Sequence, residues 1–198
     1  MSINALGDLA ATVYLIGCHG DRRAAIFHDD TDRRNWLGVL AHVCLRHRWR
    51  VYAFCQMGNH YQLVAAPLAA SWRGGIHELN KVYSQRFNAR HRSPGQRWQV
   101  RLQGQCLHDP AQVLELARHV VLEPVRAGLV ATPGGWPWSS YAMTCDPALA
   151  PPWLATESIL GRFAATHADA VAAYRRFVAD GCGSRASTPA LTVAAAEK

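Results

Sequence analysis

The sequence predicts an α+β fold: a ferredoxin-like antiparallel sheet with helices packed on one face, followed by a small helical C-terminal appendage. The expected elements follow the order β-α-β-β-α-β-α. Gly58-Asn59 lies between two apolar, β-prone runs and suits the positive φ of a tight hairpin turn. With 198 residues, of which 49% are hydrophobic, the chain is long enough to bury a core.

The first strand is expected over residues 12–18, which are rich in apolar and β-branched side chains. Residues 20–23 then form a basic loop. The Asp-Thr-Asp run at 30–32 can cap a helix that extends to about His47, because its apolar residues recur at helical spacing.

Residues 51–55 and 61–65 form the expected hairpin. Side chains alternate along a strand, so His60, Gln62 and Val64 share one face and the residues between them share the other. Residues two apart lie roughly 6.5 Å from each other, so both polar tips can reach one divalent cation. The alternative is that His60 is a hydrogen-bonded structural residue.

A second helix is expected from about Ser71 to Arg90, with an apolar stripe that begins at Ile76. Its end and the following loop are rich in cations, with no acid among them, and Trp98 lies within this run. This composition favours contact with a nucleic-acid backbone. The cations are Lys81, Arg86, Arg90, Arg92, Arg97 and Arg101.

The net charge of +7 comes almost entirely from arginine. Arginine suits bidentate phosphate contact, so a polyanion is the first expected partner, with a solvated basic surface as the alternative. No stretch approaches the roughly 18 apolar residues that span a membrane, and no charged secretory start is present. The protein is therefore expected to be cytoplasmic. Its six cysteines lack C-x-x-C spacing, which argues against a zinc finger or disulfide framework.

A further strand is expected over residues 99–107, and Asp109 with Pro110 then begins a helix. This helix ends near Glu123, because a proline follows and disfavours α geometry in the residue before it. His119 and Glu123 are four residues apart and lie on one side of the helix if its last turn holds. Taken alone, the pair is a surface ion pair or a cap.

The loop at 133–141 is rich in tryptophan and proline, and we expect it to pack on the core, with base stacking as the alternative. The appendage at 149–181 contains helical stretches at about 156–163 and 169–179. Residues 182–198 lack an apolar period and are expected to be a disordered tail.

The hairpin sequence, Gln-Met-Gly-Asn-His-Tyr-Gln-Leu at 56–63, resembles the M-x-N-H-Y-H-L motif of the REP-associated tyrosine transposases, a branch of the single-tyrosine HUH transposases. The resemblance extends over about residues 10–181, and it makes residues 1–148 an HUH transposase-like catalytic and DNA-binding domain. Four further stretches agree in order: 20–27, 83–88, 123–130 and 136–141.

The resemblance implies a fold and a chemistry. Family members have a ferredoxin-like sheet, bind hairpin-forming single-stranded DNA at repetitive extragenic palindromes, and cut and rejoin strands. Two histidines hold Mg²⁺ or Mn²⁺, which polarises the scissile phosphate. A helix tyrosine attacks phosphorus and becomes linked to the 5′ end of the DNA. A polar residue one turn beyond that tyrosine completes the metal site.

The chain departs from this family pattern at two places. Gln62 stands where the second metal histidine belongs, and its amide oxygen can still bind a hard cation. His119 stands where the family has its nucleophilic tyrosine, and Glu123 takes the third-ligand position. The resemblance therefore implies a metal site of His60, Gln62 and Glu123, with Mg²⁺ or Mn²⁺ as cofactor if the altered site still binds metal.

Three hypotheses follow for the chemistry. In the first, the fold and the DNA surface remain while strand cleavage is impaired or lost. In the second, the altered metal site works with His119 as nucleophile or base. In the third, Tyr83 replaces the nucleophile, although its position on an apolar stripe favours core packing. A protein-interaction module that uses the tryptophan-rich loop and the appendage is the alternative without DNA.

We therefore predict a transposase-like protein that recognises hairpin-forming, REP-type single-stranded DNA, with impaired cleavage and transposition. The alternative is an active metal-dependent transposase or endonuclease that nicks and rejoins single strands. The protein is expected to be a monomer or homodimer without a membrane partner. Phosphate contacts are expected from Arg22, Arg23, Lys81, Arg86, Arg90, Arg92, Arg97, Arg101 and Arg126.

Overall fold

The structure is a computed structural model that describes residues 12–68, 72–93, 98–107 and 109–182. The side chains of Arg22, of Pro110 and of residues 98–107, including Arg101, lie outside this description. Arg97 and residues 183–198 of the predicted tail also lie outside the described residues.

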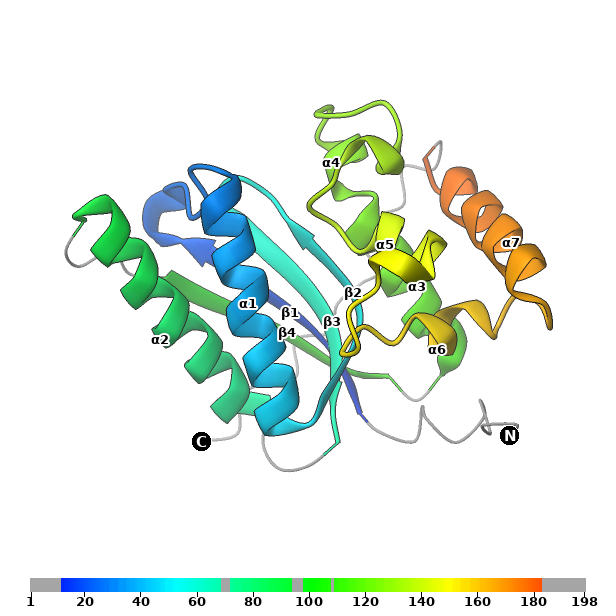
Figure 1. The fold of residues 1–198 in the computed structure, drawn as a ribbon, viewed down its shortest axis with the longest axis horizontal. Coiled ribbons are helices and arrows are strands. Elements are labelled where there is room, and N and C mark those ends of the chain that lie inside the picture. Colours follow the sequence, from blue (N-terminus) through cyan, green and yellow to red (C-terminus); the bar gives the residue numbers. More distant parts are fainter. Residues whose placement is uncertain (1–11, 69–71, 94–97, 108, 183–198) are drawn as a thin grey trace.

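One four-stranded sheet forms the centre of the molecule (Figure 1). Its strand order is β2-β3-β1-β4, and every neighbouring pair is antiparallel. This is the predicted ferredoxin-like arrangement, in which β1 and β3 lie side by side at the centre and β2 and β4 form the edges. The strands are β1 (Val13–Gly20), β2 (Trp49–Gln56), β3 (His60–Pro67) and β4 (Trp98–Leu107).

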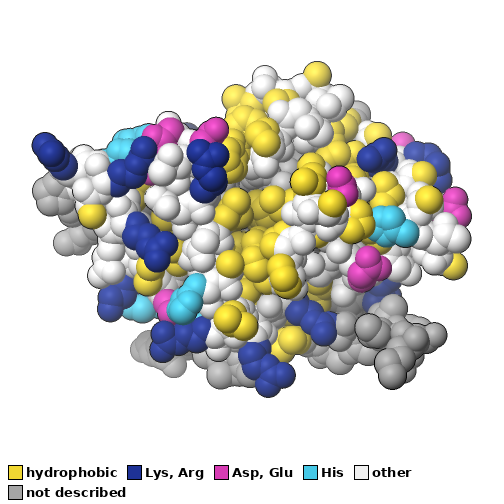
Figure 2. Space-filling view, viewed as in Figure 1, with side chains coloured by type: hydrophobic (Ala, Val, Ile, Leu, Met, Phe, Trp, Pro, Cys, Tyr) yellow, Lys and Arg dark blue, Asp and Glu magenta, His cyan; other side chains and the backbone are white. Residues whose placement is uncertain are grey.

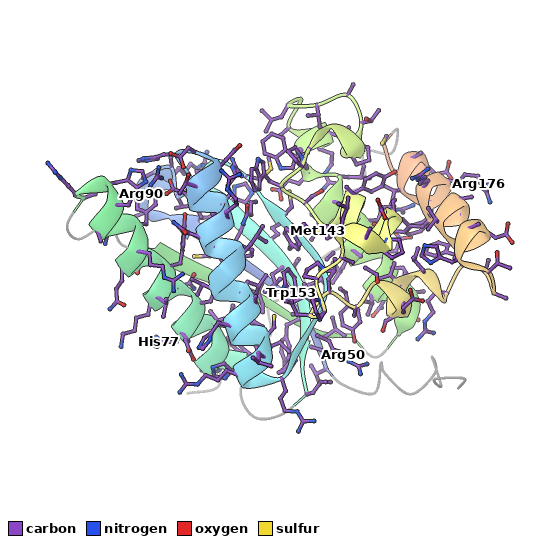
Figure 3. All side chains as sticks on the ribbon, in the orientation of Figure 1. Arg50, His77, Arg90, Met143, Trp153 and Arg176 are labelled. Carbon is purple, nitrogen blue, oxygen red and sulfur yellow. The ribbon has the colours of Figure 1, made fainter. Side chains whose placement is uncertain are left out.

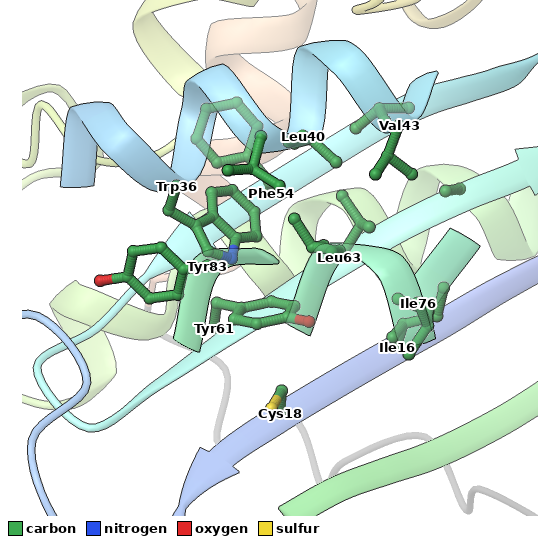
Figure 4. Close-up of a cluster of buried hydrophobic side chains, with 14 of the residues drawn as sticks. Ile16, Cys18, Trp36, Leu40, Val43, Phe54, Tyr61, Leu63, Ile76 and Tyr83 are labelled. Atoms are coloured by element: carbon green, nitrogen blue, oxygen red, sulfur yellow. The ribbon is translucent and has the colours of Figure 1, made fainter. Parts of the chain in front are cut away.

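Two long helices, α1 (Asp30–His47) and α2 (Trp72–His91), cover one face of the sheet, which confirms the predicted helix layer (Figure 1). Their apolar sides meet strand residues such as Leu63 in one buried cluster (Figure 4). The cap of α1 is Asp29, whose carboxylate accepts from the amides of the second and third helical residues. The predicted cap at 30–32 is therefore wrong, because those residues already have helical geometry.

The opposite face of the sheet is covered by α3 (Pro110–Val121) and the C-terminal helices. Val64 of β3, Val120 of α3 and Tyr174 of α7 belong to one buried cluster, so the predicted appendage contributes to this core. The remaining helices are α4 (Glu123–Arg126), α5 (Tyr141–Cys145), α6 (Thr156–Leu160) and α7 (His167–Asp180), with the 3-10 turns η1 (Asp21–Arg23), η2 (Pro133–Gly135) and η3 (Pro147–Leu149). Within the described ranges, no helix combines the length and apolar content that a membrane span requires.

The tryptophan-rich loop packs on the core, as predicted. Trp136 donates its indole N–H to the carbonyl of Gln56 at 3.1 Å, and the amide of Gln56 donates to the carbonyl of Trp138 at 2.9 Å. Arg33 of α1 donates to the same Gln56 carbonyl at 2.8 Å, and its guanidinium lies over both indole rings. The loop therefore fixes the end of β2 just before the hairpin turn.

Candidate functional site

The β2–β3 turn lies at one end of the sheet and is held from both sides. The amide of Ile26 donates to the carbonyl of Gly58 at 3.0 Å, and the amide of Gly20 donates to the carbonyl of Asn59 at 3.0 Å. The hairpin is confirmed, but its turn does not use positive φ at either Gly58 or Asn59, so the predicted turn type is wrong. The amide of Met57 donates to the carbonyl of His60 at 2.8 Å and closes the turn instead.

His60 begins β3 and lies at the centre of the candidate site. Its Nε2 donates to Oε1 of Glu123 at 2.5 Å, and its Nδ1 lies 2.8 Å from Oδ1 of Asn59. The ring of His19 on β1 stacks on His60 with centroids 4.7 Å apart, because the two residues are paired across the strands. No sequence motif marks His19, since only the register of β1 against β3 brings it to His60.

The junction between α3 and α4 brings Glu123 to His60. Helix α3 ends at Val121, and Glu123 begins the short α4 with Pro124 in its first turn. The predicted end of the helix near the proline is therefore confirmed. The contact between His60 and Glu123 joins residues 63 positions apart, which the hairpin sequence alone does not reveal.

His119 lies one turn before Glu123 and is half-buried. Burial lowers the pKa of its imidazole, the nearby Arg126 guanidinium acts in the same direction, and the carboxylate of Glu123 opposes them. Arg126 also donates to the backbone carbonyl of His119. The lowered pKa favours the neutral imidazole, the form that a base or a nucleophile requires.

Two buried oxygens near His60 lack a hydrogen-bond partner among the described residues. They are Oε1 of Gln62, two residues along the same face of β3, and Oε2 of Glu123. The amide and carboxylate oxygens are donors that suit Mg²⁺ or Mn²⁺, and His60 adds a single imidazole, so these residues fit the implied ion. His60, Gln62 and Glu123 would hold the ion.

Tyr83 lies on the other side of the sheet, in the cluster beneath α1 and α2 (Figure 4). It is 1% exposed, and its hydroxyl donates to the carbonyl of Ile26 at 2.6 Å. Burial raises the pKa of its phenol far above the ordinary value. The structure therefore does not bring Tyr83 to His60, which faces α3.

The predicted phosphate-binding cations have different surroundings. Lys81, Arg86 and Arg92 are exposed on and just after α2, and Arg23 is exposed at the end of β1. Arg90 lies at the end of α2 next to α1 (Figure 3) and is bound by Asp29 and Asp32, two acids that the sequence run itself does not contain. Figure 2 shows Lys and Arg side chains scattered over the α1–α2 half of this face.

Comparisons with known proteins place the fold. No model of a known protein family and no curated protein matches the sequence. A solved structure described as a REP-associated tyrosine transposase bound to a REP hairpin matches with a TM-score of 0.58 and 14% identity. The match covers 73% of this chain and 86% of that chain. The chain therefore shares its fold with this transposase, in agreement with its strand order and with the layer formed by α1 and α2.

Proposed function

We propose that this protein binds hairpin-forming single-stranded DNA at the end of the sheet that carries His60, and that its capacity to cleave the strand is impaired. The observation that carries the proposal is the convergence of cations at that end. The C-terminal end of α2 and the short α4, which contains Arg126, lie along the upper edge of the molecule in Figure 1. Arg23 belongs to η1, which follows β1 at the same end of the sheet.

Backbone contacts support this path for DNA. The side-chain amide of Asn59 lies 3.4 Å from the carbonyl of Arg23, so Arg23 is a neighbour of His60. The end of α2 is tied to the start of α1 by Arg90, which leaves Arg86 and Arg92 exposed beside it. A strand that follows this edge meets positive charge on both sides of His60, as backbone binding requires. The hairpin bound by the fold neighbour is in line with this choice of ligand.

The residue at the position of the family tyrosine supports impaired cleavage. An imidazole replaces the phenol at His119, and it is half-buried with its own carbonyl bound by Arg126. Tyr83 is buried in the core on the other face of the sheet, where its hydroxyl donates to the carbonyl of Ile26. Binding therefore depends on surface cations, whereas cleavage depends on a position that lacks the usual nucleophile.

The alternative, an active single-strand nuclease, is favoured by the unpartnered oxygens of Gln62 and Glu123. A bound Mg²⁺ or Mn²⁺ would polarise the scissile phosphate. The neutral His119 would donate a nitrogen lone pair to phosphorus, the P–O3′ bond would break, and the leaving oxygen would take a proton. The product is an acid-labile phosphoramidate that links His119 to the 5′ end.

A labelled single-stranded hairpin with Mn²⁺ tests both possibilities. We expect a mobility shift that weakens steeply as salt rises, because counterions are released from each contacted phosphate. Arg23→Gln with Arg86→Gln should reduce the slope of log affinity against log salt by about 1 for each lost contact. Arg176→Gln, on α7 away from this edge (Figure 3), is the matched control.

A denaturing gel of the same reactions reads cleavage. We expect neither a shortened strand nor a covalent adduct. An adduct that forms in wild type and disappears in His119→Ala would establish the nuclease instead. Binding that does not change with salt, or that responds equally to the Arg23 and Arg176 variants, would contradict the proposed DNA surface.

A further inference from the structure

A second group of polar side chains lies between α1 and α2, apart from the candidate site. His28 precedes α1, Asp32 lies in its first turn, and His91 is the last residue of α2. One ligand atom of each residue lies within 4.8 Å of the other two. Three chain segments thus bring two imidazoles and one carboxylate together.

Hydrogen bonds fix the orientation of the Asp32 carboxylate. It is 1% exposed, and its Oδ2 accepts from the backbone amide of His28 at 2.9 Å. Nε2 of His91 lies 2.9 Å from both of its oxygens. The carboxylate and this imidazole nitrogen are therefore already close enough to bind one ion together. The ion would lie between them, where the hydrogen of the imidazole now lies.

Phe87 supports the two imidazoles. Its ring is 1% exposed and lies 4.9 Å from that of His28 and 4.5 Å from that of His91, between ring centroids. The two imidazoles are themselves 4.5 Å apart, with an interplanar angle of 63°. The rings are therefore packed against a rigid wall, which reduces the entropy lost when both bind one ion.

Arg90 contacts Asp32, and its positive charge opposes the binding of a metal ion there. Its guanidinium is held by both oxygens of Asp29, at 2.8 and 2.6 Å, and it touches Asp32 at Oδ1. Oδ2 of Asp32 has no contact with Arg90 among the described residues. Asp29 thus neutralises the guanidinium, and Oδ2 of Asp32 faces the histidines. One guanidinium nitrogen of Arg90 also lies 3.2 Å from Nε2 of His91, so Arg90 must move away from this nitrogen when an ion binds.

We propose that His28, Asp32 and His91 bind one divalent transition-metal ion of the Zn²⁺ class. Two imidazoles and a carboxylate form a common ligand set for Zn²⁺, whereas Mg²⁺ prefers oxygen donors. His28 is exposed, so solvent can complete the coordination. The ion would join the start of α1 to the end of α2, and the proposal does not depend on the proposed DNA function.

Metal titration of the whole protein tests the site. The experiment uses Zn²⁺ against a chromophoric competitor, and Co²⁺ with its visible absorption. A His60→Ala background removes the candidate functional site as a second binder. We expect one equivalent to bind, with affinity reduced by more than about 100-fold in His28→Ala and in His91→Ala, beyond what the loss of an outer-shell partner costs.

His77→Ala is the matched control, because His77 is exposed on the same helix at its other end (Figure 3). We expect it to bind like the background protein. His28 is exposed, so His28→Ala folds and decides the question even if His91→Ala does not. Equal affinity in His28→Ala and the background would overturn the proposal, as would no binding or binding that is lost with His60.

Discussion

Two histidine–carboxylate contacts lie at the same end of the sheet, on opposite faces. Asp32, beneath α1 and α2, is 1% exposed and accepts hydrogen bonds at both oxygens. The Glu123 side chain, beneath α3, is 18% exposed, and its Oε2 has no hydrogen-bond partner among the described residues. The Asp32 carboxylate therefore connects two helices through both of its oxygens, whereas Glu123 uses only one of its oxygens.

A third contact, around Glu78, differs in its partners, since the exposed Arg46 also binds this carboxylate. His47 at the end of α1 lies 2.7 Å from Glu78 of α2, and Arg46 lies 3.1 Å from the same carboxylate. Glu78 thus links α1 and α2, as Asp32 does, but near the end of α1 and the start of α2. Similar distances thus occur in three environments, so burial and the number of partners decide what each contact contributes to stability.

The largest expected effect is the loss of Asp32. Asp32→Asn should lower the free energy of unfolding by about 3 kcal/mol, because a buried carboxylate is removed from its cationic partner. Glu123→Gln should change it by less than about 1 kcal/mol, since one oxygen is already unpartnered. Urea unfolding with EDTA present measures both. Equal losses would show that burial does not separate the two carboxylates.

The two helix layers can be compared through their glycines. A methyl group at Gly75 of α2 would overlap the buried ring of Trp49, whereas one at Gly181 meets side-chain atoms of Leu122 and Arg118. Gly75→Ala should cost about 2 kcal/mol by overpacking, and Gly181→Ala less than about 1 kcal/mol.

Gly38→Ala on α1 is the control for the glycine variants, because nothing lies within 4 Å of the added methyl group. It should stabilise the protein by up to about 1 kcal/mol through helix propensity. Thermal unfolding ranks the three variants. If Gly75→Ala destabilises the protein no more than Gly181→Ala does, the ring of Trp49 can move aside as easily as the side chains around Gly181, and the comparison fails.

The smallest effect concerns the contact between His47 and Glu78, and it depends on pH. The hydrogen bond from His47 lowers the pKa of Glu78, burial opposes this, and the charge of Arg46 adds to the lowering. A lowered pKa stabilises the fold above the unfolded value of about 4.3, and the stabilisation is lost as pH falls through the folded value.

The stability difference between wild type and Glu78→Gln should therefore be below about 1 kcal/mol at pH 6, and it should shrink as the pH falls below about 4. Urea unfolding from pH 3 to 7 measures this difference. Glu157→Gln is the control, since Glu157 is 82% exposed. A difference that grows toward low pH would reverse the sign and rule out this account.

Much of the fold could be predicted because local signals agree with it. Alternation along β3 correctly placed His60 and Val64 on one face and Leu63 on the other. The proline after Glu123 correctly placed a break near the end of α3. The predicted turn type was wrong. Gly58-Asn59 favours positive φ, but neither residue adopts it, and the hydrogen bond from the amide of Met57 to the carbonyl of His60 closes the turn instead.

The candidate site was only partly predictable. The motif around His60 and the spacing of His119 and Glu123 predicted a site that combines these segments, and His60 and Glu123 are in contact in the structure. Neither signal contains the 2.5 Å contact between His60 and Glu123, nor the stacking of His19 on His60. For Arg90 the sequence was misleading. The stretch around it contains no acid, but in the structure Asp29 and Asp32 at the start of α1 bind its guanidinium.

The sequence by itself determined the order of strands and helices and the inward faces of the strands. It also showed a histidine and a glutamine at the positions where the family that it resembles has its tyrosine and second histidine. These properties depend on neighbours within a few positions, where periodicity and turn preferences act. Only the tertiary structure decided which carboxylate meets which histidine, and it placed His28 and Asp32 against His91. Such contacts join residues about 60 positions apart, and sheet register and helix packing fix them because no local signal spans that distance.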